Sequence, residues 1–269
     1  MERIRQSFKQ ALSQTGLYLI LFSSVVTIVG IIGYDNFIDN YVHRILFVAS
    51  IFAMAYFVAV IRCYFKQSID IDLDNNRSVC IEYSDLFSKQ GVVVIPFNQF
   101  FDTIVDGKIL NETSIAGQLV KNKYAGNLNA LDIGIAETTS KLNHIFTSEK
   151  EGKKFAYPIG TVAKVQQGAN DYYCVALTGV DDDYRPTCDI EKLHIAIIEV
   201  LKLIDKEANG KDVYMPVLGS GLSGLNRDKQ AILKYLIYTL KASSIPIRTK
   251  LHIVLYEGDR KHFNLSNLQ

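Results

Sequence analysis

VYMPVLGSGLSGL, residues 213–225, carries the sharpest signal in this chain. An apolar run typical of a buried strand leads directly into a loop with three glycines, and a helical pattern follows from about Asn226 or Arg227. Glycine adopts positive φ angles and lets main-chain amides approach a ligand closely. Loop amides and the N-terminus of a following helix attract anionic phosphates. The stretch therefore indicates either a phosphate-binding loop or a plain tight turn.

Strand and helix patterns alternate on both sides of this stretch. Strands are expected at 69–73, 79–83, 91–96, 172–177, 213–218 and 250–256, and helices at 114–124, 128–142, 190–207 and 227–241. The run Gly91–Pro96 is apolar without alternation, as in a strand that is covered on both faces. This order predicts an α/β sheet with helices on both sides, and a ligand site beyond the C-terminal ends of the strands.

Two long apolar segments precede this pattern. Residues 16–33 and 45–61 contain no charged side chain. A hydrocarbon layer of ~30 Å needs roughly 20 helical residues, with about 17–25 the usual range, so both segments fall at the short end of the range that predicts transmembrane helices. Two buried core helices of a soluble protein, or a cleaved signal peptide in place of the first segment, are the alternatives.

The charges flanking these segments predict their orientation. Basic residues precede the first segment and follow the second, whereas the connecting loop 34–44 carries two aspartates and a single arginine. Positive residues stay on the cytoplasmic side of a membrane. We therefore expect a transmembrane hairpin over 1–66, with both termini cytoplasmic, followed by a cytoplasmic domain over 67–269. Ser23, Ser24 and Thr27 favour self-association of the first span, although small residues are common in such helices.

Composition excludes several classes of protein. The chain is 48% hydrophobic and 21% charged, which excludes a disordered protein. A net charge of +1 and the lack of an aromatic RNA-binding run argue against nucleic acid as a partner. The four cysteines have irregular spacing typical of reduced, packed thiols, and the five histidines lack paired metal-binding spacing. The sequence therefore assigns no metal site, no bound cofactor and no catalytic residue.

Two polar residues after the early strands extend the ligand hypothesis. Asp85 follows the strand at 79–83, and Asn98 follows the run at 91–96. Taken alone, Asp85 fits a helix cap or turn and Asn98 fits a strand-end turn. Together with the glycine loop, they resemble the macro domain, the family that binds ADP-ribose and its relatives. The resemblance covers roughly residues 77–260 and implies a mixed sheet flanked by helices.

The resemblance also implies a role for each of these residues. Asp85 would contact the adenine, Asn98 would lie near the distal ribose, and the loop after the late strand would hold the diphosphate. The loop residues are Gly219, Ser220, Gly221, Leu222, Ser223 and Gly224. Arg227 and Lys229 either help to hold phosphate or lie on a solvated helix face.

The segment after Asn98 departs from the family pattern. Ordinary macro domains carry a further asparagine and small residues there, whereas this chain has Phe100, Phe101 and Asp102. Two bulky aromatic side chains near the distal end argue against ADP-ribosyl hydrolase activity. In a hydrolase, Asn98 and Asp102 would position a water, with Asp102 as general base, although such an aspartate more often caps a helix.

With the predicted hairpin included, the chain resembles the membrane-anchored macro-domain effector of type II Thoeris anti-phage systems. That resemblance implies that a partner TIR-domain enzyme converts NAD into histidine-linked ADP-ribose. The macro domain would sense this signal, oligomerise and disrupt the bacterial inner membrane, which causes abortive cell death. A membrane-tethered ADP-ribosyl hydrolase and a passive reader of ADP-ribosylated proteins are the alternatives.

Overall fold

The computed structural model describes residues 66–73, 77–147 and 149–268, together with residues 23, 49–51, 53, 54, 56–58 and 61. The chain divides into two compact units, one spanning Ser68–Phe263 and the other comprising residues 1–67 and 264–269. The second unit includes the 3₁₀ helix η4 (Leu265–Leu268).

The predicted transmembrane hairpin falls almost entirely outside the described residues. Its spans were expected at 16–33 and 45–61, where only scattered residues, all helical, are described. Within the described part of the chain, no helix combines the length and apolar character needed to cross a bilayer.

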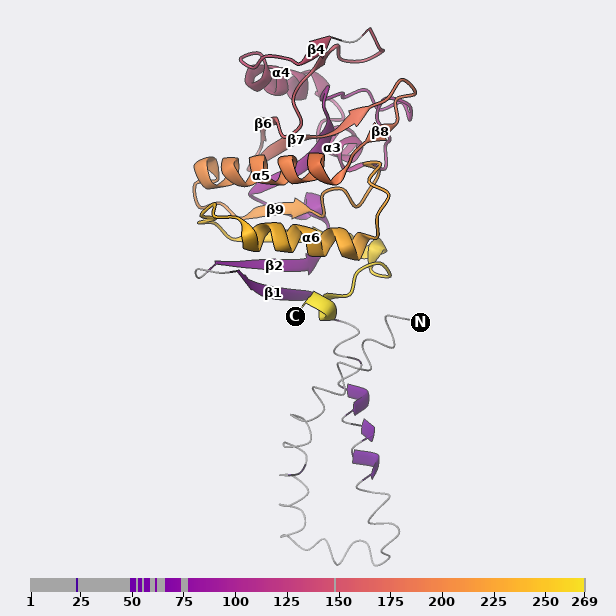
Figure 1. Cartoon of the computed structure of the whole chain (residues 1–269), viewed down its shortest axis with the longest axis vertical. Coiled ribbons are helices and arrows are strands. Elements are labelled where there is room, and N and C mark those ends of the chain that lie inside the picture. Colours follow the sequence, from indigo (N-terminus) through magenta and orange to yellow (C-terminus); the bar gives the residue numbers. More distant parts are fainter. Residues whose placement is uncertain are drawn as a thin grey trace, which may run out of the picture. The chain divides into compact units, whose positions relative to one another are not determined.

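The larger unit is built on a mixed, eight-stranded sheet (Figure 1). The strand order is β1-β2-β10-β9-β3-β7-β6, and β8 pairs with β7. The strands are β1 (Ser68–Leu73), β2 (Arg77–Tyr83), β3 (Val92–Asn98), β6 (Val162–Gln167), β7 (Asn170–Val180), β8 (Pro186–Thr187), β9 (Val213–Pro216) and β10 (Leu251–Leu255). Neighbours among β2, β10, β9, β3 and β7 pair in parallel, whereas β1, β6 and β8 pair antiparallel. The mixed sheet expected for a macro domain is therefore confirmed.

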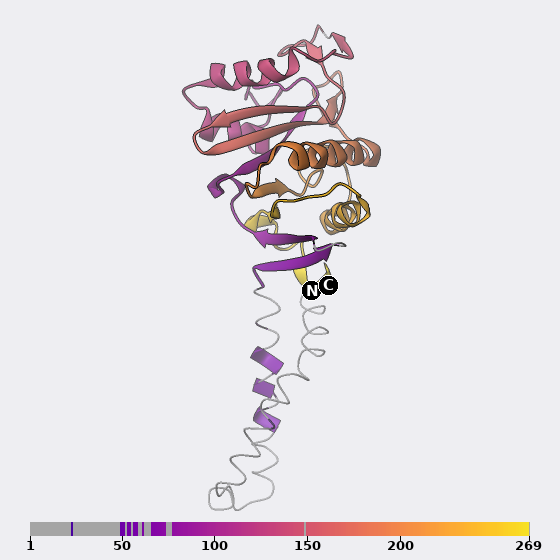
Figure 2. The same ribbon diagram turned by 90° about the vertical axis from the view of Figure 1, so that its left-hand side faces the viewer.

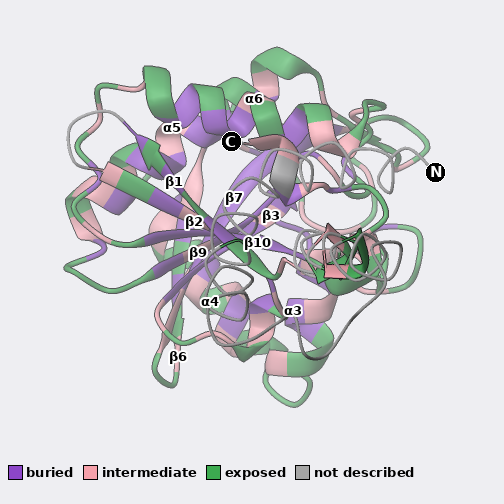
Figure 3. Ribbon diagram, turned by 90° about the horizontal axis from the view of Figure 1, so that it is seen from below, coloured by how far each residue is buried: buried purple, intermediate pink, exposed green. Residues whose placement is uncertain are grey.

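Helices cover both faces of this sheet, as predicted. Helices α5 (Ile190–Glu207) and α6 (Lys229–Ala242) lie on one face, and α3 (Ile115–Lys123) and α4 (Leu128–Thr139) lie on the other (Figure 3). Figure 2 shows α5 and α6, in orange and yellow, along the same side of the strands. The run at 91–96 becomes β3, whose residues Val92 to Ile95 are fully buried because helices pack on both of its faces.

Helix α5 shows how local sequence and packing agree. Leu193, Ile197 and Ile204 recur at helical spacing and are at most 1% exposed. The Asp189 carboxylate accepts a hydrogen bond from the Lys192 N–H at 2.8 Å, which satisfies one of the open donors of the first turn. The predicted bounds, 190–207, are therefore those observed.

Two other predicted elements are shorter in the structure. Helix α4 ends at Thr139 rather than at residue 142, and Leu142, which is 45% exposed, finds no core to join. Strand β9 ends at Pro216, and Val217 and Leu218 are buried within the following loop instead. In both cases the hydrophobic residues of the sequence continue past the residue at which the hydrogen-bonded helix or strand ends.

Strand β6 was not predicted, although it carried a signal. It forms a hairpin with β7, and Gln167 pairs with Asn170 across the two-residue turn Gly168–Ala169. Gly168 has a φ of +59°, the left-handed conformation that such tight turns require. Three short strands were missed as well: β8, and the separate pair β4 (Phe146–Thr147) and β5 (Phe155–Ala156).

A buried histidine joins three strands through polar contacts. His252 on β10 is 7% exposed, and its Nδ1 lies 3.1 Å from Glu82 Oε1 on β2. Its ring stacks on Tyr214 of β9 with centroids 4.6 Å apart. Its Nε2 is buried without a hydrogen-bond partner among the described residues, and the nearest carboxylate oxygen, on Asp212, is 4.0 Å away. Burial lowers the pKa of His252 below its ordinary value of 6.5, against the opposing effect of the Glu82 carboxylate.

The lowered pKa of His252 predicts a loss of stability on mild acidification. An imidazole that protonates more readily when unfolded makes the unfolded chain bind more protons, so the free energy of unfolding falls as the pH drops below 6.5. His252→Gln removes this titration. Urea unfolding of the full chain in detergent, from about pH 7.5 to about pH 5, should show the advantage of wild type over the variant shrinking. An advantage that stays constant or grows would contradict the assignment.

Candidate functional site: a cleft at the strand ends

A cleft of about 1220 Å³ lies at the carboxyl ends of the parallel strands. Because these strands run in the same direction, five loops from distant parts of the chain meet there. Its lining includes Asp85 after β2, Asn98 at the end of β3, Tyr184 after β7, the segment 219–223 after β9 and Tyr256 after β10. Typical small-molecule sites occupy roughly 300–1,000 Å³, so the cleft has room for a nucleotide-sized ligand.

The loop after β9 is held in shape by its own serines. The Ser220 hydroxyl donates to the Val217 carbonyl at 2.7 Å, and the Ser223 hydroxyl donates to the Gly219 carbonyl at 2.9 Å. Among the described residues, the N–H groups of Gly221, Leu222 and Ser223 have no acceptor. All three residues line the cleft. The loop therefore presents fixed, unused main-chain donors, which is the arrangement that binds phosphate oxygens.

Gly221 and Gly224 serve different purposes in this loop. A Cβ added at Gly221 would meet no atom within 4 Å, so a side chain there would reach the cleft it lines without a protein clash. Gly224 does not line the cleft. It has a φ of +79°, and an added Cβ would lie 2.2 Å from the Pro186 carbonyl oxygen. Gly224 therefore lets the loop pack against β8 and supports the site from behind.

The helix after the loop corrects one prediction. Helix α6 begins at Lys229 rather than near residue 226 or 227, and its N-cap is Asp228. The Asp228 carboxylate accepts a hydrogen bond from the Ala231 N–H at 2.9 Å, so the chain's own anion already occupies this helix terminus. Arg227 does not line the cleft, whereas Lys229 does, with its ammonium 2.7 Å from Asp259.

Asp85 combines the capping role with a position in the cleft. Its Oδ1 accepts the N–H of Phe87 at 3.0 Å and caps the 3₁₀ helix η2 (Leu86–Ser88). Its other carboxylate oxygen, Oδ2, has no hydrogen-bond partner among the described residues, and the side chain is exposed to the cleft. The turn fixes the carboxylate while leaving one oxygen to accept a ligand N–H.

Asn98 also lies in the cleft, yet its amide mainly builds a turn. Its Oδ1 accepts the N–H groups of Phe100 at 3.1 Å and of Asp102 at 3.3 Å. Its Nδ2 donates to Asp102 Oδ2 at 3.0 Å. An amide nitrogen carries two hydrogens, so one N–H of Asn98 is left for a ligand.

The position of Asp102 does not suit a general base. It is 1% exposed and does not line the cleft. Besides Asn98, its carboxylate accepts the Lys150 ammonium at 2.8 Å and the Lys153 N–H at 2.8 Å. A general base must reach the proton that it removes, and this carboxylate is enclosed by three donors. Asp102 thus neither caps a helix nor faces the cleft, and it ties the 150–153 segment to the end of β3.

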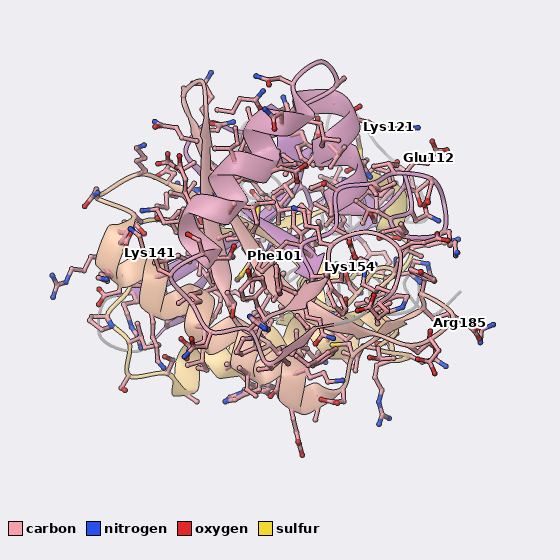
Figure 4. The ribbon with its side chains drawn as sticks, turned by 90° about the horizontal axis from the view of Figure 1, so that it is seen from above. Phe101, Glu112, Lys121, Lys141, Lys154 and Arg185 are labelled. Atoms are coloured by element: carbon pink, nitrogen blue, oxygen red, sulfur yellow. The ribbon has the colours of Figure 1, made fainter. Side chains whose placement is uncertain are left out.

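The two phenylalanines near Asn98 correct another prediction. Phe100 and Phe101 are 3% and 0% exposed, and neither lines the cleft. The Phe101 ring packs between Phe97 and Tyr157, with centroid distances of 6.1 and 6.0 Å, and lies inside the domain in Figure 4. A φ of +53° at Phe101 turns the chain so that its ring enters the core. The two rings therefore do not stand in the cleft, where the sequence pattern placed them near its distal end.

The charged side chains that line the cleft balance one another. Four are basic and four are acidic: Lys108, Lys121, Arg185 and Lys229, against Asp85, Glu112, Asp183 and Asp259. Three pairs form within the lining: Lys121 with Glu112, Arg185 with Asp183 at 3.5 Å, and Lys229 with Asp259 at 2.7 Å. Figure 4 shows Glu112 beside Lys121, and Arg185 extending outward. Asp85 and Lys108 are left without a partner in the lining.

Sequence reasoning missed two of the segments that line the cleft. Residues 107–116 run from β3 toward α3, and residues 183–186 form the turn between β7 and β8. Both turns are built on aspartates whose side chains accept main-chain N–H groups, Asp106 in the first and Asp181 in the second. An Asp-Gly pair at 106–107 and three successive aspartates at 181–183 signalled turns, but not their meeting at one site. No cluster of three metal-ligating side chains occurs in the parts of the chain that are described.

Comparison with known proteins finds a matching family and several similar proteins. A family model described as Thoeris protein ThsA, Macro domain, matches residues 79–256. Thoeris protein ThsA of Bacillus amyloliquefaciens (strain Y2) is 28% identical over 226 residues, which cover 79% of this chain and 73% of that protein. A macrodomain mutant of Oceanobacillus iheyensis is 14% identical with a TM-score of 0.47, over 75% of this chain and 91% of that one. The macrodomain of the same organism with ADP is 14% identical with a TM-score of 0.42, over 74% and 94%.

The enclosed ion pair predicts that Asp102 acts on stability. Asp102→Ala leaves the largely buried Lys150 ammonium without its carboxylate, and loss of one buried partner costs about 3–5 kcal/mol. Asp102→Ala combined with Lys150→Met should recover part of that loss, because no charge is then stranded. Urea unfolding of the full chain in detergent measures both. An Asp102→Ala variant as stable as wild type would contradict the structural role.

Proposed function

We propose that the cleft binds an ADP-ribose-type nucleotide. The chain belongs to the macro-domain family of Thoeris protein ThsA, whose family model matches residues 79–256. The observation that carries the proposal is the row of N–H groups at Gly221, Leu222 and Ser223, which line the cleft and have no acceptor among the described residues. Main-chain donors of this kind match the oxygens of a diphosphate. The open oxygen of Asp85 matches the amino group of an adenine.

The dimensions of the sheet support an extended ligand. Asp85 follows β2 and Tyr184 follows β7, and these strands are four steps apart in the sheet order. At about 4.8 Å per step, the two ends of the cleft are ~19 Å apart. The glycine loop follows β9, which lies between them. A base at Asp85, a diphosphate at the loop and a sugar toward Asn98 and Tyr184 follow this order.

The finer parts of the proposal rest on the family. The signal is a histidine-linked ADP-ribose made by a TIR-domain partner, and the chain is anchored in the bacterial inner membrane by its N-terminal hairpin. Ligand binding favours a state of the chain that self-associates. This requires that the ligand bind that state with higher affinity than the other state. Association of the hairpins then disrupts the bilayer. The enclosure of Asp102 supports sensing over hydrolysis.

The cleft predicts the binding behaviour of two variants. Calorimetry of the full chain in detergent should show binding of histidine-linked ADP-ribose and weaker binding of ADP-ribose. Asp85→Ala removes a charged acceptor and should cost roughly tenfold or more in affinity. Gly221→Glu brings a carboxylate toward the diphosphate and should cost at least as much. Gly126→Glu is the matched control, because Gly126 also has open space around it but does not line the cleft.

Lack of binding by the wild-type chain would refute the proposed function. If binding is found, the full chain reconstituted in dye-filled vesicles separates the remaining alternatives. Release of dye on addition of histidine-linked ADP-ribose supports the effector. Binding without release supports a passive reader, and consumption of the ligand supports a hydrolase.

A further inference from the structure

Lys108 differs from the other basic residues of the cleft. The carboxylate partners of Lys121, Arg185 and Lys229 line the cleft themselves, so each of those charges is offset within the site. The partner of Lys108 is Glu151, at 3.0 Å, and Glu151 does not line the cleft. Lys108 is therefore the one cation in the described lining whose counter-ion stands outside the site.

The Tyr184 ring also contacts this lysine, and it does so without the Glu151 carboxylate. The Lys108 ammonium lies 4.4 Å from the centroid of the Tyr184 ring, within the range of a cation–π interaction. Tyr184 lines the cleft and has a left-handed backbone, with a φ of +63°. Its hydroxyl accepts the main-chain N–H of Glu151 at 2.7 Å. The Glu151 carboxylate can thus leave Lys108 while the main chain of Glu151 and the Tyr184 ring remain joined.

Asp102 holds the loop that carries Glu151 in place. The Asp102 carboxylate accepts the ammonium of Lys150 and the N–H of Lys153, on both sides of Glu151. Gly152 has a φ of +89°, and an added Cβ there would lie 2.5 Å from Asp102 Oδ1, so the loop wraps closely around this carboxylate. The Glu151 side chain, by contrast, is 66% exposed, and among the described residues its only side-chain partner is Lys108.

We propose that Lys108 binds an anionic group at the far end of the ligand, and that Glu151 serves as its counter-ion until the ligand replaces it. This inference rests on the proposed function and assigns the residue that would bind a negative group of the ligand beyond its diphosphate. A carboxylate suits the site, because the Lys108 ammonium already donates to the Glu151 carboxylate. The exchange preserves the number of ion pairs and returns Glu151 to water.

Two conjugates that differ by one carboxylate test this exchange. ADP-ribose linked to histidine carries the carboxylate, and ADP-ribose linked to histamine lacks it. Calorimetry of the full chain in detergent should show that wild type prefers the histidine conjugate by roughly threefold to tenfold. Lys108→Met should abolish this preference and leave the affinity for the histamine conjugate within about twofold. Lys141→Met, on an exposed residue outside the cleft, is the control and should retain the preference.

Glu151→Gln gives the sharper result, because the expected sign is opposite to that of structural damage. Loss of the internal competitor should tighten binding of the histidine conjugate by roughly twofold to fivefold and leave the histamine conjugate unchanged. Weaker binding in this variant, or an equal loss for both conjugates in Lys108→Met, would overturn the exchange. Wild type that binds both conjugates and ADP-ribose equally would overturn it, while leaving intact the proposal that the cleft binds an ADP-ribose-type nucleotide. Wild type that binds none of the three would overturn both.

Discussion

Parallel pairing of the central strands is the constraint on which the rest of the structure depends. Strands β2, β10, β9, β3 and β7 all point the same way, so each crossover returns the chain across the sheet before the next strand begins. The apolar faces of the helices bury both sides of β3. Asp85, Asn98 and the glycine loop, far apart in sequence, consequently meet at one edge of the sheet.

The bounds of helices and strands were predicted most accurately where the local sequence pattern and the tertiary packing agree. Helix α5 kept its predicted bounds because its apolar stripe and its Asp189 cap specify the same helix. The ends of β9 and α4 were misjudged, because hydrophobicity records burial and does not record where backbone pairing stops. Strand β6 was not predicted, although the glycine at position 168 indicated a turn between two strands of a hairpin.

The site was predictable in position but not in detail. Asp85, Asn98 and residues 219–223 share one cleft, whereas Gly224 stands behind it. The pattern could not reveal that Asp228 already caps α6, or that the phenylalanines after Asn98 turn into the core. It also could not reveal that Lys150, 48 residues further along the chain, encloses Asp102. Each of these facts depends on where the fold places a side chain, which a sequence pattern does not record.

The balanced lining of the cleft has a consequence for how quickly a ligand arrives. Proteins that draw anions from a distance do so with an excess of one sign of charge, and their association rates fall steeply as ionic strength rises. Here four basic and four acidic side chains face the same space, so little net field extends beyond a screening length of about 8 Å. We therefore expect the proposed anionic ligand to reach this cleft by unsteered diffusion, at a rate that rises with ligand concentration and changes little with salt.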